Sequence, residues 1–456
     1  MPTDAPDLAA LRFARHALGT RFEDLPPAAV RAAKTFLLDT LGVGVSAATD
    51  PNVAPLVQAV AGWGAGGEAA VWGRRECLPA PAAALINGFQ VHCQEYDCVH
   101  EAAVLHPMAT LVPAALAWAE RAGGVTGRAF LVALAIGVDV AIGLGLAARA
   151  GLRFFRPATA GGFGATAAVA RLAGLDEPAL AGAFGLQYAQ TSGTMQPHVE
   201  GSPALPLQIG CNSRAALAAC DLAQAGIAGP RDVFEGPFGY LPLFEGEWDL
   251  APIWPTLGRL WRIAELSHKP YPAGRATHAG IEGVAALRAA HGFTPADIAH
   301  ITVLGPPLVQ RLCGRPAIPD PSPAYARLCM GFVIAKRLQY GALDPTHYRG
   351  AALRDPETFA LARRVTTLAD GNPDPNALAP QSVRVDLNDG TSVEWQCERM
   401  LANPARPLSP EQHLTKFRRC WSLAAAPLGP PEALIDIVEH LEELDDMRAL
   451  AALLAP

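Results

Sequence analysis

Lysine is scarce in this chain of 456 residues. It occurs at only four positions, Lys34, Lys269, Lys336 and Lys416, and arginine supplies the rest of the positive charge. The sequence has no block of basic residues, and its formal net charge is −7. We therefore do not expect a protein that binds nucleic acid.

Closely spaced cysteines are also absent. The nine cysteines include no Cys-x-x-Cys pair, which argues against a zinc or iron–sulfur site built from local cysteine spacing. We expect reduced, mostly buried thiols. The N-terminus has no basic start followed by an apolar run, so we expect no secretory signal peptide and a cytoplasmic protein.

The segment Phe130–Ala148 is apolar enough to suggest a membrane span. Asp139 lies at its centre, however, and Gly137, Gly143 and Gly145 interrupt its large side chains. We therefore expect a buried helix that packs through its small residues, and no membrane partner. Half of the chain is hydrophobic and 17% is charged, which favours much buried helix or a large subunit interface.

Residues 5–265 have a helical pattern almost throughout. Some segments begin with proline in the first turn, as at Pro26-Pro27 and at Asp176-Glu177-Pro178. No convincing strand-type alternation occurs here, so we expect an all-α domain. The predicted helices span residues 26–48, 80–92, 107–122, 128–149, 161–173, 178–192 and 209–226.

The pattern changes after Lys269. Residues 298–305 have the composition of a strand, and residues 383–397 alternate on both sides of Asn388-Asp389-Gly390, which is typical of a β-hairpin. Helices are predicted near residues 276–291, 324–339 and 356–367. Residues 269–404 therefore read as a smaller α+β domain.

Two further helices close the chain. One begins at Ser409-Pro410-Glu411, which combines an N-cap, a proline and an acidic first turn, and the other spans residues 430–453. We expect both to pack on the N-terminal helices. The predicted fold class is mainly α, with a discontinuous all-α domain (1–268 and 405–456) and a smaller α+β domain (269–404).

The stretch NGFQVHCQEYDCVHEAAVLHP, residues 87–107, gathers ionisable side chains beside apolar helical sequence. Such side chains are costly near a core unless they are paired, bound to a ligand or used in catalysis. We expect this stretch to form part of an active site. Its histidines are His92, His100 and His106, and its other ionisable residues include Glu95, Asp97, Cys98 and Glu101.

Seven segments, in order, resemble the MmgE/PrpD family, whose members include 2-methylcitrate dehydratase, cis-aconitate decarboxylase and iminodisuccinate epimerase. The resemblance implies a large helical domain, a smaller α+β lid domain, a homodimer and an active site between the domains. It also implies chemistry without a metal or an organic cofactor. The segments are LLDTLGVGVSA (37–47), AALINGFQVHCQEYDCVH with the later HP (83–107), RPATAGGFGA (156–165), EGS to G (200–210), AGIAGPRDVFEG (225–236), KPYPAGRATHAGIEG (269–283) and ARLCMGFVIAKRL (326–338).

Several positions depart from the family pattern, although His106, His278 and Asp97 are retained. The combination indicates a distinct subfamily and weighs against both methylcitrate dehydration and aconitate decarboxylation. The substitutions are Glu95 for aspartate, Val99 for threonine, Arg156 for histidine, Leu205 for lysine, Gln208 for histidine, Cys329 for serine and Phe332 for tyrosine.

The family reactions share the making or breaking of a C–H bond next to a carboxylate. Histidine suits this proton transfer because its ordinary pKa is about 6.5. We expect His106 and His278 to be the catalytic acid and base, acting on one substrate from opposite sides, with Asp97 orienting a histidine. A structural role is the alternative for each: a backbone bond at a helix start for the histidines, and an ion pair for Asp97.

Cationic side chains would hold the carboxylates of the substrate, because the donor fork of arginine binds two oxygens at once. Arg156, Lys269 and Arg275 are the candidates, and we expect Arg156 to fix an additional or repositioned carboxylate. Further candidates for substrate binding are Glu95, His100, His198, Glu200 and Gln208.

A metal site is conceivable in the same stretch, but the spacing fits no recognised local pattern and the resemblance argues against it. The expected function is a cofactor-independent, dehydratase-type lyase acting on a small di- or tricarboxylate. Two alternatives stay open: an epimerase or isomerase of a dicarboxylate such as iminodisuccinate, and a catalytically inactive member that binds a carboxylate. The metal ligands would be His92, Asp97, His100 and His106.

Overall fold

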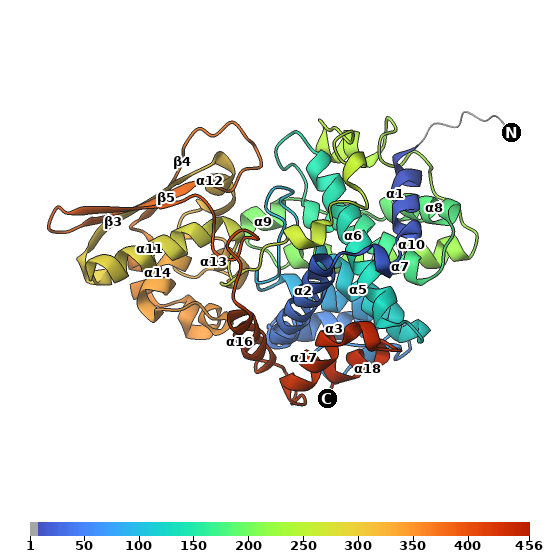
Figure 1. Ribbon diagram of the computed structural model, residues 1–456. Coiled ribbons are helices and arrows are strands. Elements are labelled where there is room, and N and C mark those ends of the chain that lie inside the picture. Colours follow the sequence, from blue (N-terminus) through green and yellow to red (C-terminus); the bar gives the residue numbers. More distant parts are fainter. Residues whose placement is uncertain (1–7) are drawn as a thin grey trace.

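The computed structural model describes residues 8–456, which form a large helical part and a smaller part that carries a sheet (Figure 1). The predicted fold class, mainly α with a smaller α+β domain, is confirmed.

Local sequence accounts for many helix boundaries in the large domain. Thr126 and Asp176 cap α6 (Gly127–Ala147) and α8 (Glu177–Tyr188) by accepting hydrogen bonds from backbone N–H groups, and prolines occupy the first turn of several helices. The other helices are α1 (Ala9–Gly19), α2 (Pro27–Ser46), α3 (Val53–Ala61), α4 (Ala80–His92), α5 (Pro107–Ala122), α7 (Arg156–Leu172), α9 (Gln196–Glu200) and α10 (Ala204–Gln224).

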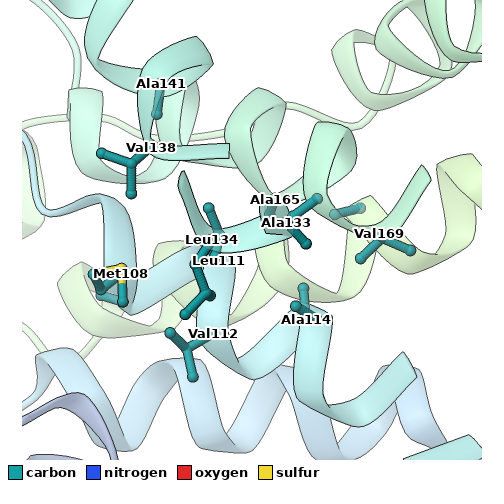
Figure 2. Packing of buried hydrophobic residues seen from close by; sticks show 14 of the residues in the cluster. Met108, Leu111, Val112, Ala114, Ala133, Leu134, Val138, Ala141, Ala165 and Val169 are labelled. Carbon is teal, nitrogen blue, oxygen red and sulfur yellow. The ribbon is translucent and has the colours of Figure 1, made fainter. Parts of the chain in front are cut away.

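The helix α6 lies in the core of the large domain, packed against α5 and α7 (Figure 2). It is long and apolar enough to cross a membrane. However, 89% of its most apolar 18-residue stretch is buried inside the protein, as expected for a core helix. Asp139 at its centre is paired with His16, whose Nε2 lies 3.0 Å from Oδ2. A Cβ at Gly137 would lie 2.2 Å from the side chain of Leu111, so glycine is needed for this packing.

The helices α4 and α10 cross at close range, which fixes the end of α4 that carries His92. A Cβ at Gly210 would lie 2.0 Å from the carbonyl oxygen of Leu85, and a Cβ at Gly88 would lie 2.9 Å from the Cα of Gly210. Only glycine allows the two backbones to approach this closely.

The smaller domain is built on a four-stranded sheet with the order β4-β3-β5-β6. The strand β3 (Ile298–Gly305) pairs parallel with β4 (Val365–Ala369) and antiparallel with β5 (Gln381–Leu387), which pairs antiparallel with β6 (Ser392–Cys397). Alternate residues of β3 and β5 are buried beneath α11 and α14 (Figure 1). The helices are α11 (His278–His291), α12 (Pro307–Cys313), α13 (Pro323–Arg327), α14 (Met330–Tyr340) and α15 (Pro356–Ala362).

The last helices, α16 (Pro410–Trp421), α17 (Pro431–Glu439) and α18 (Arg448–Ala451), lie against the large domain (Figure 1). Phe417, Leu434 and Leu450 join its hydrophobic core, whereas apolar residues between 276 and 400 form a separate core. This grouping supports the domain boundaries that we propose, at 268/269 and 404/405.

Three predicted helices differ in the structure. The segment 324–339 is broken between α13 and α14, where the carbonyl oxygen of Arg327 accepts a hydrogen bond from Gly274 N. The segment 356–367 ends as a helix at Ala362, and its β-branched continuation forms β4 because it pairs with β3. The segment 430–453 is divided, because Leu444 O accepts a hydrogen bond from Gly127 N at the start of α6 and Met447 N donates to Val125 O just before it.

The expected all-α character of residues 5–265 also needs correction. The strands β1 (Ala69–Ala70) and β2 (Cys77–Leu78) form a short antiparallel pair. Most of residues 227–265 is loop with short 3-10 or π turns, whose backbone hydrogen bonds are mainly local, as from Tyr240 N to Val233 O.

Candidate active site

A cavity between the two domains receives side chains from both. Its ionisable lining residues, within the part of the chain that the structure describes, are His92, Glu95, His106 and His198 from the helical domain and Arg275 and Cys313 from the lid. The rest of the wall is largely apolar. The volume open to the centre of a water molecule is about 60 Å³, whereas one water needs about 10–15 Å³.

Asp97 joins two histidines at the wall of this cavity. His92 Nδ1 donates to Asp97 Oδ2 at 3.0 Å. His106 Nδ1 donates to Cys98 O at 2.9 Å and lies 3.1 Å from the same oxygen of Asp97, at ion-pair distance. The sequence places them there because His92 ends α4, His106 immediately precedes Pro107 of α5, and Asp97 lies in the loop between. The Nε2 edge of His106 is therefore left for a substrate, and Nε2 of His92 is buried without a hydrogen-bond partner, 3.4 Å from Glu95 Oε1.

The pKa values of the two histidines are shifted in opposite directions. Burial acts to lower the pKa of His92, but the carboxylates of Asp97 and Glu95 outweigh it and raise the pKa. Burial lowers the pKa of His106, and Lys269 adds to this against the opposing effect of Asp97. The same histidines hold the pKa of Asp97 well below its ordinary value, although burial alone would raise it. His106 is thus suited to accept a proton and His92 to donate one.

A buried ion pair lies beside the histidines. Lys269 Nζ lies 2.9 Å from Glu95 Oε2, and His92 Nε2 lies 3.4 Å from Glu95 Oε1. Burial alone would raise the pKa of Glu95, but Lys269 and His92 lower it to about 2. Glu95 is therefore a carboxylate at neutral pH, and its charge is compensated inside the protein.

Two residues on the cavity wall have strained backbones. Glu95 and Val104 have φ angles of 52° and 49°, in the left-handed region that favours glycine. Ala402 is the third such non-glycine residue in the described chain. Strain of this kind persists where the surrounding structure enforces it, often at functional sites.

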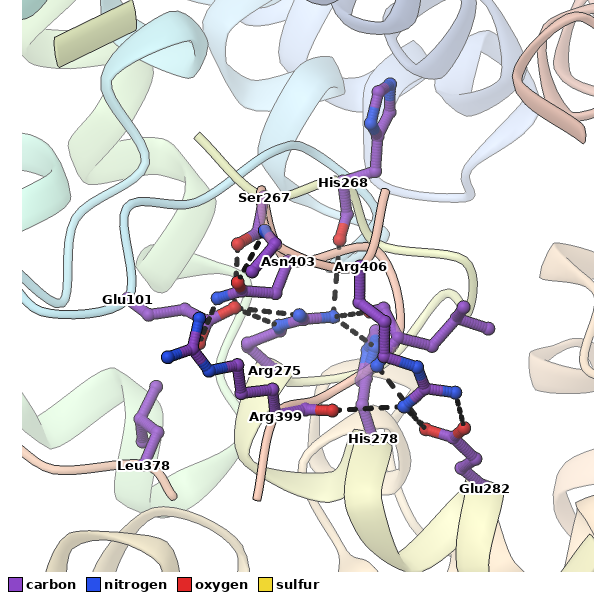
Figure 3. Close-up of polar contacts among 12 residues, drawn as sticks. Glu101, Ser267, His268, Arg275, His278, Glu282, Leu378, Arg399, Asn403 and Arg406 are labelled. Carbon is purple, nitrogen blue, oxygen red and sulfur yellow. Dashed lines mark hydrogen bonds and ion pairs between the residues drawn. The ribbon is translucent and has the colours of Figure 1, made fainter. Parts of the chain in front are cut away.

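Arg275 connects the lid to the helical domain (Figure 3). Its Nη2 lies 2.7 Å from Glu101 Oε1, which also accepts a hydrogen bond from Ser267 Oγ at 2.7 Å. Its Nη1 donates to Leu401 O at 2.9 Å. Arg275 therefore reaches the cavity wall with its charge already paired.

His278 does not occupy the position expected for a base opposite His106. It is buried, does not line the cavity, and uses both ring nitrogens within the lid: Nδ1 accepts from Arg275 Nη1 at 3.2 Å, and Nε2 donates to Ala273 O at 3.1 Å (Figure 3). Burial and Arg275 hold its pKa well below the ordinary value. The histidines that line the cavity with His106 are His92 and His198.

Arg156 is also engaged elsewhere. Its Nε lies 2.9 Å from Glu245 Oε2, its Nη1 donates to Asn376 Oδ1 at 3.0 Å, and its Nη2 donates to Ala150 O at 3.1 Å. The side chain is buried and does not line the cavity. The expected clamp is therefore a structural ion pair in this conformation, because Glu245 neutralises the guanidinium.

The remaining candidates divide into one that lines the cavity and three that do not. His198 lines it, and burial with Arg315 lowers the pKa of His198 to about 4. The other three bond elsewhere: His100 Nε2 to Glu265 Oε2 at 3.1 Å, Glu200 to Gln196, and Gln208 to the backbone of Thr194.

Within residues 8–456, two groups of side chains have the composition of a metal site. One is the cavity triad of His92, Asp97 and His106, and the other combines Asp39 with His268 and His413. In the triad, a hydrogen bond from His92 and an ion-pair contact with His106 account for the close approach to Asp97. In the second group, the Asp39 carboxylate is paired with Lys416 Nζ at 2.7 Å.

Comparison with known proteins identifies the family. The MmgE/PrpD N-terminal domain matches residues 11–253, and the MmgE/PrpD C-terminal domain matches residues 271–442. The chain belongs to the MmgE/PrpD family. The resemblance noted from the sequence is thereby confirmed, and the family's two domains correspond to the helical part and the lid.

Named relatives within this family share about a quarter of their residues with this chain. Cis-aconitate decarboxylase of Mus musculus is 26% identical over 97% of this chain and 92% of its own length. A cis-aconitate decarboxylase-like protein of Aspergillus oryzae is 26% identical, and cis-aconitate decarboxylase of Aspergillus terreus is 25% identical, each over 95% of this chain and 93% of its own length.

Sequence reasoning missed the roles that the structure gives to His92, Glu101 and Arg315. The signal for His92 and Glu101 was present, because both lie in the ionisable stretch at residues 87–107. Arg315 gave no local signal, since it meets His198 only through the contact of lid and helical domain.

Proposed function

We propose that this protein is a lyase that acts on a small di- or tricarboxylate, with His106 as base and His92 as acid. The observation that carries the proposal is the position of both histidines within 3.1 Å of one Asp97 oxygen at the cavity, combined with pKa shifts of opposite sign. A base and an acid on one cavity are what an elimination of water requires.

In the proposed reaction, His106 Nε2 takes a proton from the carbon next to a substrate carboxylate. Protonated His92 then gives its proton to the departing hydroxyl group, which leaves as water while the electron pair of the C–H bond forms the C=C bond. Asp97 stabilises the charge that develops on His106. Two proton transfers and one water molecule balance the step, and a later exchange with solvent resets both histidines.

Substrate entry would require movement of the lid. A cavity with room for only a few water molecules cannot hold a tricarboxylate and its hydration shell. The segment Lys269–Gly274 joins the domains and includes two prolines and a glycine, which suits a hinge. Closure would then exclude water from the histidines.

Decarboxylation of cis-aconitate is the second candidate. The named relatives that support it match nearly the whole chain. In this reaction the substrate loses CO₂, and protonated His92 supplies the proton to the carbanion that remains. Decarboxylation therefore needs only the acid, His92, whereas dehydration needs both His92 and the base His106.

The test is NMR of the purified protein in D₂O with citrate, 2-methylcitrate, cis-aconitate, iminodisuccinate and tartrate. Water loss with deuterium entry at the α-carbon supports the dehydratase, and CO₂ release from cis-aconitate supports the decarboxylase. Inversion without loss supports an epimerase instead. Binding of these acids without exchange or turnover of any would contradict the catalytic proposal and favour an inactive carboxylate-binding protein.

A homodimer is proposed from the resemblance to the family. Sedimentation velocity of the purified chain tests it, because a monomer of 47.8 kDa and its dimer separate clearly.

A further inference from the structure

The three cationic side chains that the sequence suggested as carboxylate clamps bring little net positive charge to the cavity. A di- or tricarboxylate carries a charge of about −2 or −3 at neutral pH, and its transfer into an apolar cavity is costly without compensating cations. Each of the three predicted clamps, however, has a protein carboxylate within 3 Å. These pairs are Lys269 with Glu95, Arg275 with Glu101 and Arg156 with Glu245.

Arg315 differs from these three side chains. It lies in the lid just after α12 and has no carboxylate partner among the residues that the structure describes. Its Nη2 donates to His198 Nδ1 at 3.1 Å and to Leu312 O at 3.2 Å, and its Nη1 is buried without a hydrogen-bond partner in residues 8–456. A buried guanidinium nitrogen without a partner is an available donor for an anion.

Arg315 does not itself line the cavity in this closed conformation, and His198 links its guanidinium to the cavity wall. His198 lies on α9 of the helical domain, is buried, and lines the cavity wall. Since Nδ1 accepts the hydrogen bond from Arg315, the neutral ring carries its proton on Nε2, so that Nε2 is a donor. Burial and Arg315 lower the pKa of His198 to about 4, so the ring stays neutral at physiological pH.

We propose that Arg315 and His198 form a carboxylate-binding subsite, which holds a carboxylate of the substrate remote from the carbon that His106 deprotonates. The proposal rests on the proposed function in that the ligand is a polycarboxylate. Arg315 Nη1 supplies a charge-assisted hydrogen bond, and His198 Nε2–H supplies a neutral one. The subsite would stand in for the cation absent at Leu205.

The subsite also spans the two domains. His198 belongs to the helical domain and Arg315 to the lid, and Ser322 Oγ of the lid bonds to Gly201 O near His198. A carboxylate bound between them therefore favours the closed arrangement. Opening of the lid would separate the two donors and weaken the subsite, which couples substrate binding to closure.

The affinity for a carboxylic acid that cannot react tests this subsite independently of catalysis. Tricarballylate, a saturated tricarboxylate without a hydroxyl group, is titrated into the full chain by calorimetry, and acetate serves as the monocarboxylate. We expect tricarballylate to bind to the original chain. Arg315→Gln should lower the affinity for tricarballylate by about tenfold or more, because a hydrogen bond to a charged group is lost. Arg315→Lys, which keeps the charge, should recover part of this loss.

His198 is tested by two substitutions. His198→Ala should lower the affinity for tricarballylate about tenfold. His198→Gln keeps an amide donor and should retain most of the affinity. Arg354→Gln is the control, since Arg354 is an exposed lid arginine paired with Asp320, and it should leave binding unchanged. Thermal unfolding of each variant shows whether it is folded.

Equal affinity of folded Arg315→Gln and the original chain for tricarballylate would overturn the subsite, as would no binding of tricarballylate to the original chain. Tricarballylate binding that depends on Arg315, in a protein that turns over none of the candidate acids, would retain the subsite and reject the lyase.

Discussion

The imidazole rings of His92 and His106 lie 5.0 Å apart, centroid to centroid, and the Nδ1 atoms of both lie within 3.1 Å of one oxygen of Asp97. Their different neighbours explain why one carboxylate does not give them the same pKa. Burial and Lys269 act to lower the pKa of both histidines and Asp97 acts to raise both, but Glu95 adds to the rise at His92. Glu95, which is paired with Lys269, therefore separates the two histidines into an acid and a base.

Replacement of His106 should abolish most of the activity without unfolding the protein. His106→Gln removes the proposed base, and loss of general-base catalysis typically lowers kcat by about 10²–10⁴-fold. The measurement is kcat and KM on the substrate found by NMR. His100→Gln in the same loop is the matched control, since His100 bonds to Glu265 and does not line the cavity. Equal losses in both variants would argue against a specific role for His106.

The pH dependence of kcat/KM should be bell-shaped. His106 must be neutral, so activity falls as the pH decreases through its lowered pKa; His92 must be protonated, so activity also falls as the pH increases through its raised pKa. Asp97→Asn removes the carboxylate that raises both values. Both limbs of the profile should then move to lower pH, and a variant whose limbs stayed in place would contradict the assignment.

Replacement of Lys269 should destabilise the protein strongly. Lys269→Met leaves the buried charge of Glu95 without its partner, and breaking a buried pair typically costs about 3–5 kcal/mol. Urea unfolding measures the loss. The double variant Lys269→Met/Glu95→Gln should recover much of the stability but not the activity, because the separation of the two histidine pKa values is lost. Recovery of both properties would show that the pair has no catalytic effect.

Arg156→Leu should lower stability rather than substrate affinity. It removes the partner of the buried Glu245, with an expected cost of about 3–5 kcal/mol in the free energy of unfolding. Arg149→Leu, at an exposed pair with Asp249, should change stability by about 1 kcal/mol or less. A large rise in KM of folded Arg156→Leu, with stability unchanged, would instead support the carboxylate clamp that the sequence suggested.

The sequence by itself determined the class of fold and the region of the site. Caps at Thr126 and Asp176, prolines in first turns and the hairpin around Asn388-Asp389-Gly390 are local signals, because they act within a few residues along the chain. The ionisable stretch from His92 to His106 was visible for the same reason, since those residues are close in sequence as well as in space.

Tertiary structure decided the role of each ionisable side chain. His278 turns to Ala273 O, Arg156 pairs with Glu245 across 89 residues, and Arg315 meets His198 across 117 residues. No periodicity or local spacing encodes such pairs. They follow from how helices and lid pack, and a buried charge is then compensated by whichever opposite charge that packing brings within reach.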